Sequence, residues 1–154
     1  MRLMRRSDRA ISRDEALILL KQAEYGILST VGEDGCPYGV PLSFALIGET
    51  LYFHSAMEGR KLDNLTNQPC VSFCIVGNTQ VLPARFTTAF ESVIVSAKAS
   101  EVFGSEKQAA LEALIDKYSA AFKTEGMAYI EKSQAKTRVI RLSIESITGK
   151  ARRI

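Results

Sequence analysis

The sequence predicts a mainly β protein with helices, of the α+β class, in which about six antiparallel strands form a barrel. Three observations predict this fold. Short β-prone segments follow one another as hairpins, one of them through the strong turn signal Asp34-Gly35. No regular crossover helices separate these segments, which argues against a doubly wound parallel sheet. Helical periodicity is confined to a few segments, so we expect helices at the ends of the barrel.

The chain is long enough for one hydrophobic core, and we expect a single domain over residues 1–154. Of the 154 residues, 46% are hydrophobic and 24% charged, which is an ordinary globular composition. The net charge of +3 is small for a nucleic-acid-binding protein. A single histidine, His54, excludes a multi-histidine metal centre, and we expect no metal site.

The first element is a helix over residues 12–24. Ser12 and Glu15 have the spacing of a capping box, in which each side chain bonds the backbone amide of the other residue. Apolar residues then recur at helical spacing until Gly26 ends the pattern.

A hairpin follows, with strands over residues 25–31 and 36–47. Pro37, Gly39 and Pro41 interrupt the second strand. Because proline cannot donate a ladder hydrogen bond, this strand is expected to be bulged or to lie at an edge. A third strand over residues 51–55 places Leu51, Phe53 and Ser55 on one face and Tyr52 and His54 on the other.

The remaining elements follow from the same reasoning. We expect a short helix over residues 58–67, strands over 71–76 and 92–102, a helix capped by Ser105, further helical turns over 126–132, and a half-buried strand over 137–147 with Ile140, Leu142 and Ile144 inward. Residues 77–90 give mixed signals, with Pro83 as a breaker.

No apolar run is long enough for a transmembrane helix, and no apolar segment follows the arginines of the N-terminus as in a signal peptide. We therefore expect a cytoplasmic protein that does not bind membranes. The cysteines are consistent with a cytoplasmic location, because Cys36, Cys70 and Cys74 are an odd number and form no CxxC pair. Cys70 and Cys74 on one strand would be about 13 Å apart, too far for a disulfide, and are expected to be small apolar fillers.

The richest segment for chemistry is residues 51–61, where a strand ends in His54-Ser55 and Gly59-Arg60-Lys61 opens a helix. A helix N-terminus presents unpaired N–H groups, and an arginine with a lysine suits a phosphate. The segment thus predicts a phosphate pocket at a strand-to-helix corner. The alternative is a solvated, charged first turn with no ligand.

Other chemistries lack their residues. No phosphate-loop or dinucleotide glycine fingerprint is present, and no serine stands on a nucleophile turn. Glu33 and Asp34 belong to a turn and do not form a carboxylate pair for glycoside chemistry. Few catalytic side chains are expected in a protein whose cofactor performs the reaction, and this sequence fits that description.

The order of several motifs strongly resembles the nitroimidazole-resistance-like branch of the pyridoxamine 5′-phosphate oxidase-related flavoproteins. The motifs are Met4 to Arg6, Tyr25 to Thr30, Asp34 to Leu42, Phe53 to Ala56, Gly59 to Lys61, Phe86 to Val93 and Thr148 to Lys150. Two positions depart from the family pattern, Phe90 where a hydroxyl-bearing aromatic is common and Ser96-Ala97 where a glycine is common. These departures leave the substrate open.

The resemblance implies a six-stranded split β-barrel that dimerises and binds FMN between its subunits. It implies that the flavin ring lies beside Val40, Pro41, Leu42 and Ser43, and that the ring and the polyol chain are surrounded by Phe53, His54 and Ser55. It implies that the phosphate is held by Gly59, Arg60 and Lys61. It also implies that Ser92 reaches the flavin of the partner subunit. For His54 it implies flavin binding, with a proton-transfer role or a simple hydrogen bond both open.

The resemblance therefore implies an FMN-dependent oxidoreductase that moves electrons from NAD(P)H or another donor to a small oxidant such as a nitroaromatic. One alternative is a flavin-binding or sensing module without catalysis. Another is a split barrel that binds haem or a deazaflavin. Nucleic-acid binding is not expected, because no aromatic residues interleave with the basic arm of Arg2, Arg5, Arg6 and Arg9.

Overall fold

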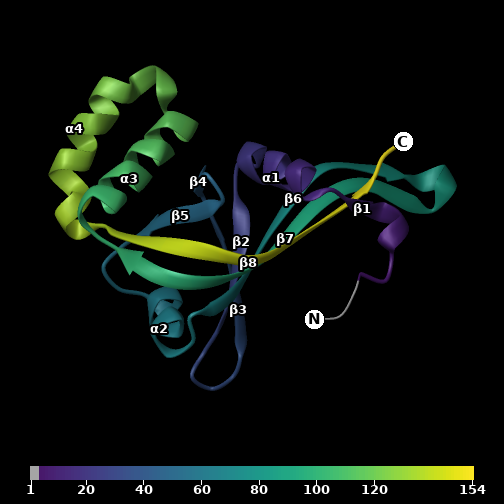
Figure 1. Cartoon of the computed structure of the whole chain (residues 1–154), viewed down its shortest axis with the longest axis horizontal. Helices are drawn as coiled ribbons and strands as arrows, with labels where there is room; N and C mark the ends of the chain where they lie inside the picture. The colour runs from purple at the N-terminus through teal and green to yellow at the C-terminus, as the bar shows by residue number, and fades with distance from the viewer. Residues whose placement is uncertain (1–3) are drawn as a thin grey trace.

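The structure is a computed structural model that describes residues 4–154, so Arg2 of the basic arm lies outside the described residues. Within them the fold is α+β, as predicted (Figure 1). The strands are β1 (Ala10–Ile11), β2 (Gly26–Val31), β3 (Pro37–Leu42), β4 (Ala45–Ile47), β5 (Thr50–Ser55), β6 (Cys70–Leu82), β7 (Thr87–Val102) and β8 (Arg138–Arg152). The α-helices are α1 (Arg13–Gln22), α2 (Arg60–Asn67), α3 (Gly104–Tyr118) and α4 (Lys123–Ser133).

The described strands form one eight-stranded antiparallel sheet, two strands more than the sequence predicts. Its order is β3-β2-β6-β7-β8-β5-β4, with β1 beside β8. The predicted strand over residues 36–47 is two strands, β3 and β4, which stand at opposite ends of this order. Because only Ser43 and Phe44 join them, the sheet must curl until its two ends approach each other. The result is a barrel that is split between β3 on one side and β4 and β5 on the other.

The barrel interior is a continuous apolar core. Its largest fully buried side chains are Phe44, Phe53, Phe73, Leu20, Leu28, Leu51, Ile75 and Leu142. Each contributes roughly 1.5–3 kcal/mol by leaving water. A second cluster lies on the opposite face of the sheet, where α3 and α4 cover Tyr52, Val102 and Val139 (Figure 1). The first residues of β8, which the sequence predicts as a half-buried strand, are therefore buried on both faces. Val139 faces α3 and α4, and Ile140 faces the barrel core.

Residues 77–90, which gave mixed signals, form the far end of a long hairpin between β6 and β7. The two strands pair from Cys70↔Lys98 to Leu82↔Thr87, and a short 3-10 turn over Pro83–Arg85 joins them. A register shift between Val76 and Thr79 interrupts the ladder. This bulge contains Gly77 and Asn78 and breaks the alternation by which sequence patterns identify strands. With the end of β8, the hairpin extends beyond the barrel as an arm (Figure 1).

Strand β8 continues to Arg152, five residues beyond its predicted end at Ile147. It contains a bulge at Glu145, because Ser96 pairs with Ser146 while Ala97 pairs with Ile144. The bulge changes which residues face the core. Before the bulge, the even-numbered residues from Ile140 to Ile144 face the core. After the bulge, odd-numbered residues face inward, among them Ile147 and the buried Gly149.

Two predictions about local structure have different outcomes. Ser12 does cap α1, since its Oγ accepts a hydrogen bond from the backbone amide of Glu15 at 3.2 Å. Ser105 does not cap α3. That helix begins at Gly104, whose φ of +56° suits glycine, and Ser105 lies in its first turn. Leu111 and Leu114 of this helix are buried, whereas Phe122, beyond its end, is exposed.

The cysteines are free thiols, and Cys70 and Cys74 lie on β6 as expected. Cys70 is exposed, so its interpretation as an apolar filler is wrong. Cys74 is half-buried, and burial raises the pKa of its thiol. From Met4 to Ile154, none of the helices is both long enough and apolar enough to cross a bilayer.

Candidate functional site

The first turn of α2 lies across the split of the barrel. The guanidinium carbon of Arg60 is 4.5 Å from the ring centre of Tyr38, which is on β3. The Nζ atom of Lys61 is 5.1 Å from the ring centre of Phe53, which is on β5. The two adjacent cations therefore lie over aromatic rings of β3 and β5, and both contacts are cation–π interactions.

The loop before α2 ends at Gly59, whose φ of +143° is open to glycine but strained for other residues. The Gly59 carbonyl accepts hydrogen bonds from Leu62 N at 2.9 Å and Asp63 N at 3.1 Å, which starts the helix. The side-chain amide of Asn64, one turn later, donates to Thr30 Oγ1 on β2 at 2.9 Å in a buried position. These contacts fix where the first turn of α2 lies.

Neither Arg60 nor Lys61 makes an ion pair or a side-chain hydrogen bond with any residue from 4 to 154. Lys61 is half-buried, and this burial lowers the pKa of its ammonium group. Asp34 lies near Arg60 without forming an ion pair. Its Oδ1 accepts a hydrogen bond from the backbone amide of Cys36 at 2.9 Å, and this bond, with a smaller effect of the Arg60 charge, lowers the pKa of its carboxyl group. Two unpaired cations at a helix start fit an anion such as phosphate.

His54 lies on β5 with its side chain on the outer face of the sheet, where it is exposed to solvent. Protein atoms still surround part of the ring. This partial burial, and secondarily the charge of Lys61, lowers the pKa of His54 below its usual 6.5. At neutral pH the imidazole is therefore uncharged, with one nitrogen that donates and one that accepts hydrogen bonds.

The other predicted residues of this segment lie differently. Ser55 is buried at 9% exposure, on the opposite face from His54. The Phe53 side chain is completely buried in the barrel core beneath Lys61. Phe53 thus supports the lysine, and only its backbone is available to a ligand.

The stretch from Val40 to Ser43 runs along β3 and into the turn before β4. Strand β3 is at the end of the strand order, so one of its edges carries no ladder partner among residues 4–154. Val40 and Leu42 pack against the core, whereas Pro41 and Ser43 are exposed. Strand β3 thus carries the predicted ring-side residues Val40 to Leu42 and the Tyr38 ring that Arg60 contacts, and β5 carries His54 beside the Phe53 ring that Lys61 contacts.

Within one chain, Ser92 lies far from His54 along the sheet. It pairs with Lys150 on β8, whereas His54 pairs with Val139, which in turn pairs with Val102. Ser92 and Val102 are ten residues apart on β7, or about 33 Å at the rise of a strand. The resemblance implies that Ser92 acts at the site of a partner subunit, and this role stays a prediction.

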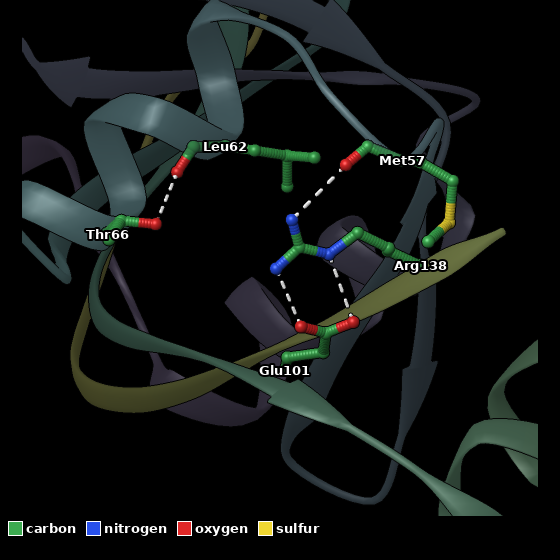
Figure 2. Close-up of polar contacts among 5 residues, drawn as sticks. All are labelled: Met57, Leu62, Thr66, Glu101 and Arg138. Carbon is green, nitrogen blue, oxygen red and sulfur yellow. Dashed lines mark hydrogen bonds and ion pairs between the residues drawn. The ribbon is translucent and has the colours of Figure 1, made fainter.

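Arg138 is a residue of the site region that sequence reasoning missed. It pairs with Ser55 in the sheet, and its Nε and Nη2 donate to the two carboxylate oxygens of Glu101 at 3.0 and 2.6 Å (Figure 2). Its Nη1 donates to the Met57 carbonyl at 3.4 Å, in the loop between β5 and α2. Figure 2 also shows that the same guanidinium lies below α2, whose Thr66 hydroxyl donates to the Leu62 carbonyl at 3.0 Å. No local pattern could reveal a pair 37 residues apart.

A second missed group holds the junction after Ser43. The Tyr118 hydroxyl accepts a hydrogen bond from Phe44 N at 3.0 Å and donates to the Glu24 carbonyl at 2.5 Å. Lys117 Nζ donates to the Phe44 carbonyl at 3.0 Å. The end of α3 thus fixes the turn between β3 and β4. Tyr118 has the spacing of a core residue, and its polar role gives no separate sequence signal.

Comparison with solved structures supports the fold. A conserved hypothetical protein from Mycobacterium tuberculosis matches with a TM-score of 0.83 at 19% identity, over 97% of this chain and 90% of that one. A proposed 5-nitroimidazole antibiotic resistance protein from Bacteroides thetaiotaomicron matches with a TM-score of 0.78 at 22% identity, over 92% and 85%. An FAD and haem binding protein from Mycobacterium smegmatis gives 0.79 at 20% identity, over 91% and 71%.

These identities are low, so the structural matches show the fold alone. None of the curated protein sequences matches this chain. The family model described as pyridoxamine 5′-phosphate oxidase, however, matches residues 12–151, which is nearly the whole chain and includes every predicted site residue. The chain therefore belongs to the pyridoxamine 5′-phosphate oxidase family.

Proposed function

We propose that this protein binds FMN and is an FMN-dependent oxidoreductase, which passes electrons from NAD(P)H or another donor to a small oxidant such as a nitroaromatic. The observation that carries the proposal is the position of Arg60 and Lys61. They are adjacent cations without an ion pair among the described residues, and they lie over aromatic rings of β3 and β5. A phosphate there would take the planar fork of the arginine and the compact charge of the lysine.

The residues around the split have distinct tasks in this proposal. Arg60 and Lys61 would hold the phosphate, and the Gly59 backbone would let it approach closely. The unpaired edge of β3 from Val40 to Ser43 would lie beside the ring. When bound, the flavin supplies the redox chemistry, and the protein supplies binding, orientation and electrostatics.

His54 would lie on the other side of the ring from β3. Its neutral imidazole can donate one hydrogen bond and accept another, and it can take up a proton as the pH falls. We propose that it binds the flavin. Transfer of a proton to or from the reacting group remains its second candidate role, with the imidazole nitrogen as the site of the proton.

We further propose a homodimer with flavin at the subunit interface. The outer face of the sheet carries exposed apolar side chains, among them Ile94 at 50% and Val76 at 63% exposure. Val76 pairs with Ser92, and Ser92 is two residues from Ile94 on β7, so the side chains of Val76, Ser92 and Ile94 lie on the same face of the sheet. The row that contains Ile94 continues through β6 and β2 to Pro41 on β3. A second copy packed on this face would therefore reach the ring-side stretch, and its own Ser92 could lie there.

A second candidate function is haem binding. The sole histidine of the chain is on the outer face, solvent-accessible and neutral, as an iron ligand must be. The similar Mycobacterium smegmatis protein is an FAD and haem binding protein. A deazaflavin would use the same Arg60-Lys61 site as FMN. A flavin-binding module without catalysis is also compatible with these residues.

The visible spectrum of the purified protein separates these candidates. We expect flavin absorbance with one FMN per chain, followed by oxidation of NAD(P)H when a nitroaromatic is added. A Soret band that His54→Ala removes would establish haem instead. Bound FMN without turnover by any donor would leave only the binding module, and a protein that rejects FMN would overturn the proposal.

A further inference from the structure

A cavity of about 540 Å³ opens beside Ser43, at the end of the predicted ring-side stretch. It lies between the end of α1, the start of β2 and the end of α3. Its walls include Lys21, Glu24, Tyr25, Ser43, Lys117 and Tyr118. The volume is in the range of cavities that bind small organic molecules.

The cavity walls are held by hydrogen bonds, so the cavity is preformed. The Tyr118 hydroxyl joins Phe44, next to Ser43, to the Glu24 carbonyl on the opposite wall, at 3.0 and 2.5 Å. Two aromatic rings remain accessible, because Tyr25 is 60% exposed and Tyr118 is 41% exposed. An aromatic ligand could pack on either ring without rearrangement of the backbone.

The cavity also contains a cation without an acidic partner among residues 4–154. Lys117 Nζ donates one hydrogen bond, to the Phe44 carbonyl at 3.0 Å, and stands 3.8 Å from the Phe44 ring centre. An ammonium group has three donors, so two remain for a ligand. Burial lowers the pKa of Lys117 to about 8, which leaves it mostly charged at neutral pH.

We propose that this cavity binds the substrate and selects an aromatic monocarboxylate, with the carboxylate on Lys117, the ring against Tyr25 and Tyr118, and the reducible substituent toward Ser43. The identification of this compound as the electron acceptor rests on the proposed function. A monocarboxylate fits better than a phosphate dianion, because Lys117 presents no arginine-like fork and the Glu24 carboxylate shares the cavity.

Binding of 4-nitrobenzoate and of neutral 4-nitrobenzyl alcohol, measured by isothermal titration calorimetry on the purified protein, tests the proposal. We expect the acid to bind at least tenfold more tightly than the alcohol. Lys117→Met should remove this preference, Lys117→Arg should retain it, and Lys136→Met, on the exposed turn before β8, should leave it unchanged. Equal affinity of the wild-type protein for the two compounds, or a preference that survives in a folded Lys117→Met variant, would overturn the proposal.

The pH dependence of the wild-type protein gives a measurement that does not depend on the folding of a variant. Affinity for 4-nitrobenzoate should fall at least fivefold as the pH rises from 7 to 9.5, because Lys117 loses its proton near pH 8. The other titratable groups at the cavity are Lys21, Glu24, Tyr25 and Tyr118. Since Lys117→Arg keeps these groups and an arginine stays charged, its affinity should fall less over the same range. An equal fall in Lys117→Arg would contradict the assignment to Lys117.

A separate titration with FMN distinguishes the two proposals. A protein that prefers the acid through Lys117 but takes up no FMN would overturn the proposed function and support the carboxylate pocket. A protein that binds FMN but does not prefer the acid would support FMN binding and overturn the carboxylate pocket. If both proposals are correct, Lys117→Met should raise KM for 4-nitrobenzoate at least tenfold more than it raises KM for the alcohol.

Discussion

The Asn64 side chain of α2 and the Thr30 side chain of β2 form a buried hydrogen bond of 2.9 Å that joins the helix to the barrel. Both residues are at most 5% exposed. Thr30 in turn donates to the backbone carbonyl of Tyr38 at 3.3 Å. The residue that stacks beneath Arg60 and the helix that carries Arg60 are thus connected through one hydroxyl group.

We predict that Asn64→Ala lowers the free energy of unfolding by about 1–3 kcal/mol, because the Thr30 hydroxyl loses its partner in a buried position. Urea denaturation measures this change. Asn67→Ala, on the exposed end of the same helix, should change stability by less than about 0.5 kcal/mol. Thr30→Val with Asn64→Ala should cost less than the sum of the single changes, and strict additivity would argue against the bond.

Arg60→Ala and Lys61→Ala should each weaken FMN binding by about 10- to 100-fold, since a hydrogen bond to a charged group is worth about 1.5–3 kcal/mol. Quenching of flavin fluorescence gives the dissociation constants. Riboflavin, which lacks the phosphate, supplies the control ligand, and its affinity should change less than threefold. If both ligands lose affinity equally, these residues do not hold the phosphate.

The stability of the protein without ligand should fall as the pH drops below 6.5, in part through His54. The pKa of His54 is lowered in the folded protein, so the unfolded chain takes up this proton first. The loss should be complete once the pH is below the folded pKa. Because His54 is the only histidine, His54→Gln should reduce the loss of stability between pH 7.5 and pH 5 in thermal unfolding. An unchanged loss in His54→Gln would show that carboxylates alone are responsible.

Arg138→Met should lower the free energy of unfolding by about 1–2 kcal/mol, because Glu101 loses a bidentate partner at a site where both side chains are under 30% exposed. The loop at Met57 also loses a contact, so FMN should bind more weakly. The double variant Glu101→Met/Arg138→Met should recover part of the stability. Arg13→Met breaks an exposed ion pair, 49% and 57% exposed, and should cost under about 0.5 kcal/mol.

Mixed dimers test whether Ser92 acts on the partner subunit. Ser92→Trp alone and Arg60→Ala/Lys61→Ala alone should each bind FMN poorly. A mixture of the two, exchanged by brief dilution and reconcentration, should regain up to one functional site in each mixed dimer. Flavin bound per chain measures the recovery. No recovery, with mixed dimers demonstrated by differently tagged chains, would place Ser92 outside the site of the partner.

The sequence predicted the class of the fold and most of the elements that carry the candidate site residues, because both depend on local patterns. The capping box at Ser12, the turn at Asp34-Gly35 and the strand that carries His54 are each specified by a few adjacent residues. Arg60 and Lys61 could be identified for the same reason. Their positions follow from the strand, loop and helix start within one short segment.

The parts that were missed depend on pairing between distant residues. Residues 77–90 read as irregular because the bulge at Gly77 and Asn78 interrupts their alternation, yet the ladder with β7 resumes beyond it. Arg138 is recognisable as part of the site region only once the sheet has brought it to Ser55. Ser105 failed as a cap because Gly104 adopts a left-handed conformation that begins the helix one residue earlier.

The bulge at Glu145 has a consequence for how proteins of this shape could diverge. It lies between the part of β8 that completes the barrel and the part that forms the arm. Deletion of Glu145 would leave every other pair of that ladder in register, but it would remove the local bend and extra twist that a bulge introduces. One codon could therefore re-aim the arm relative to the barrel, while the side chains that the arm presents stay the same. Insertions and deletions at this point offer evolution a way to change the shape of the molecule without new surface residues.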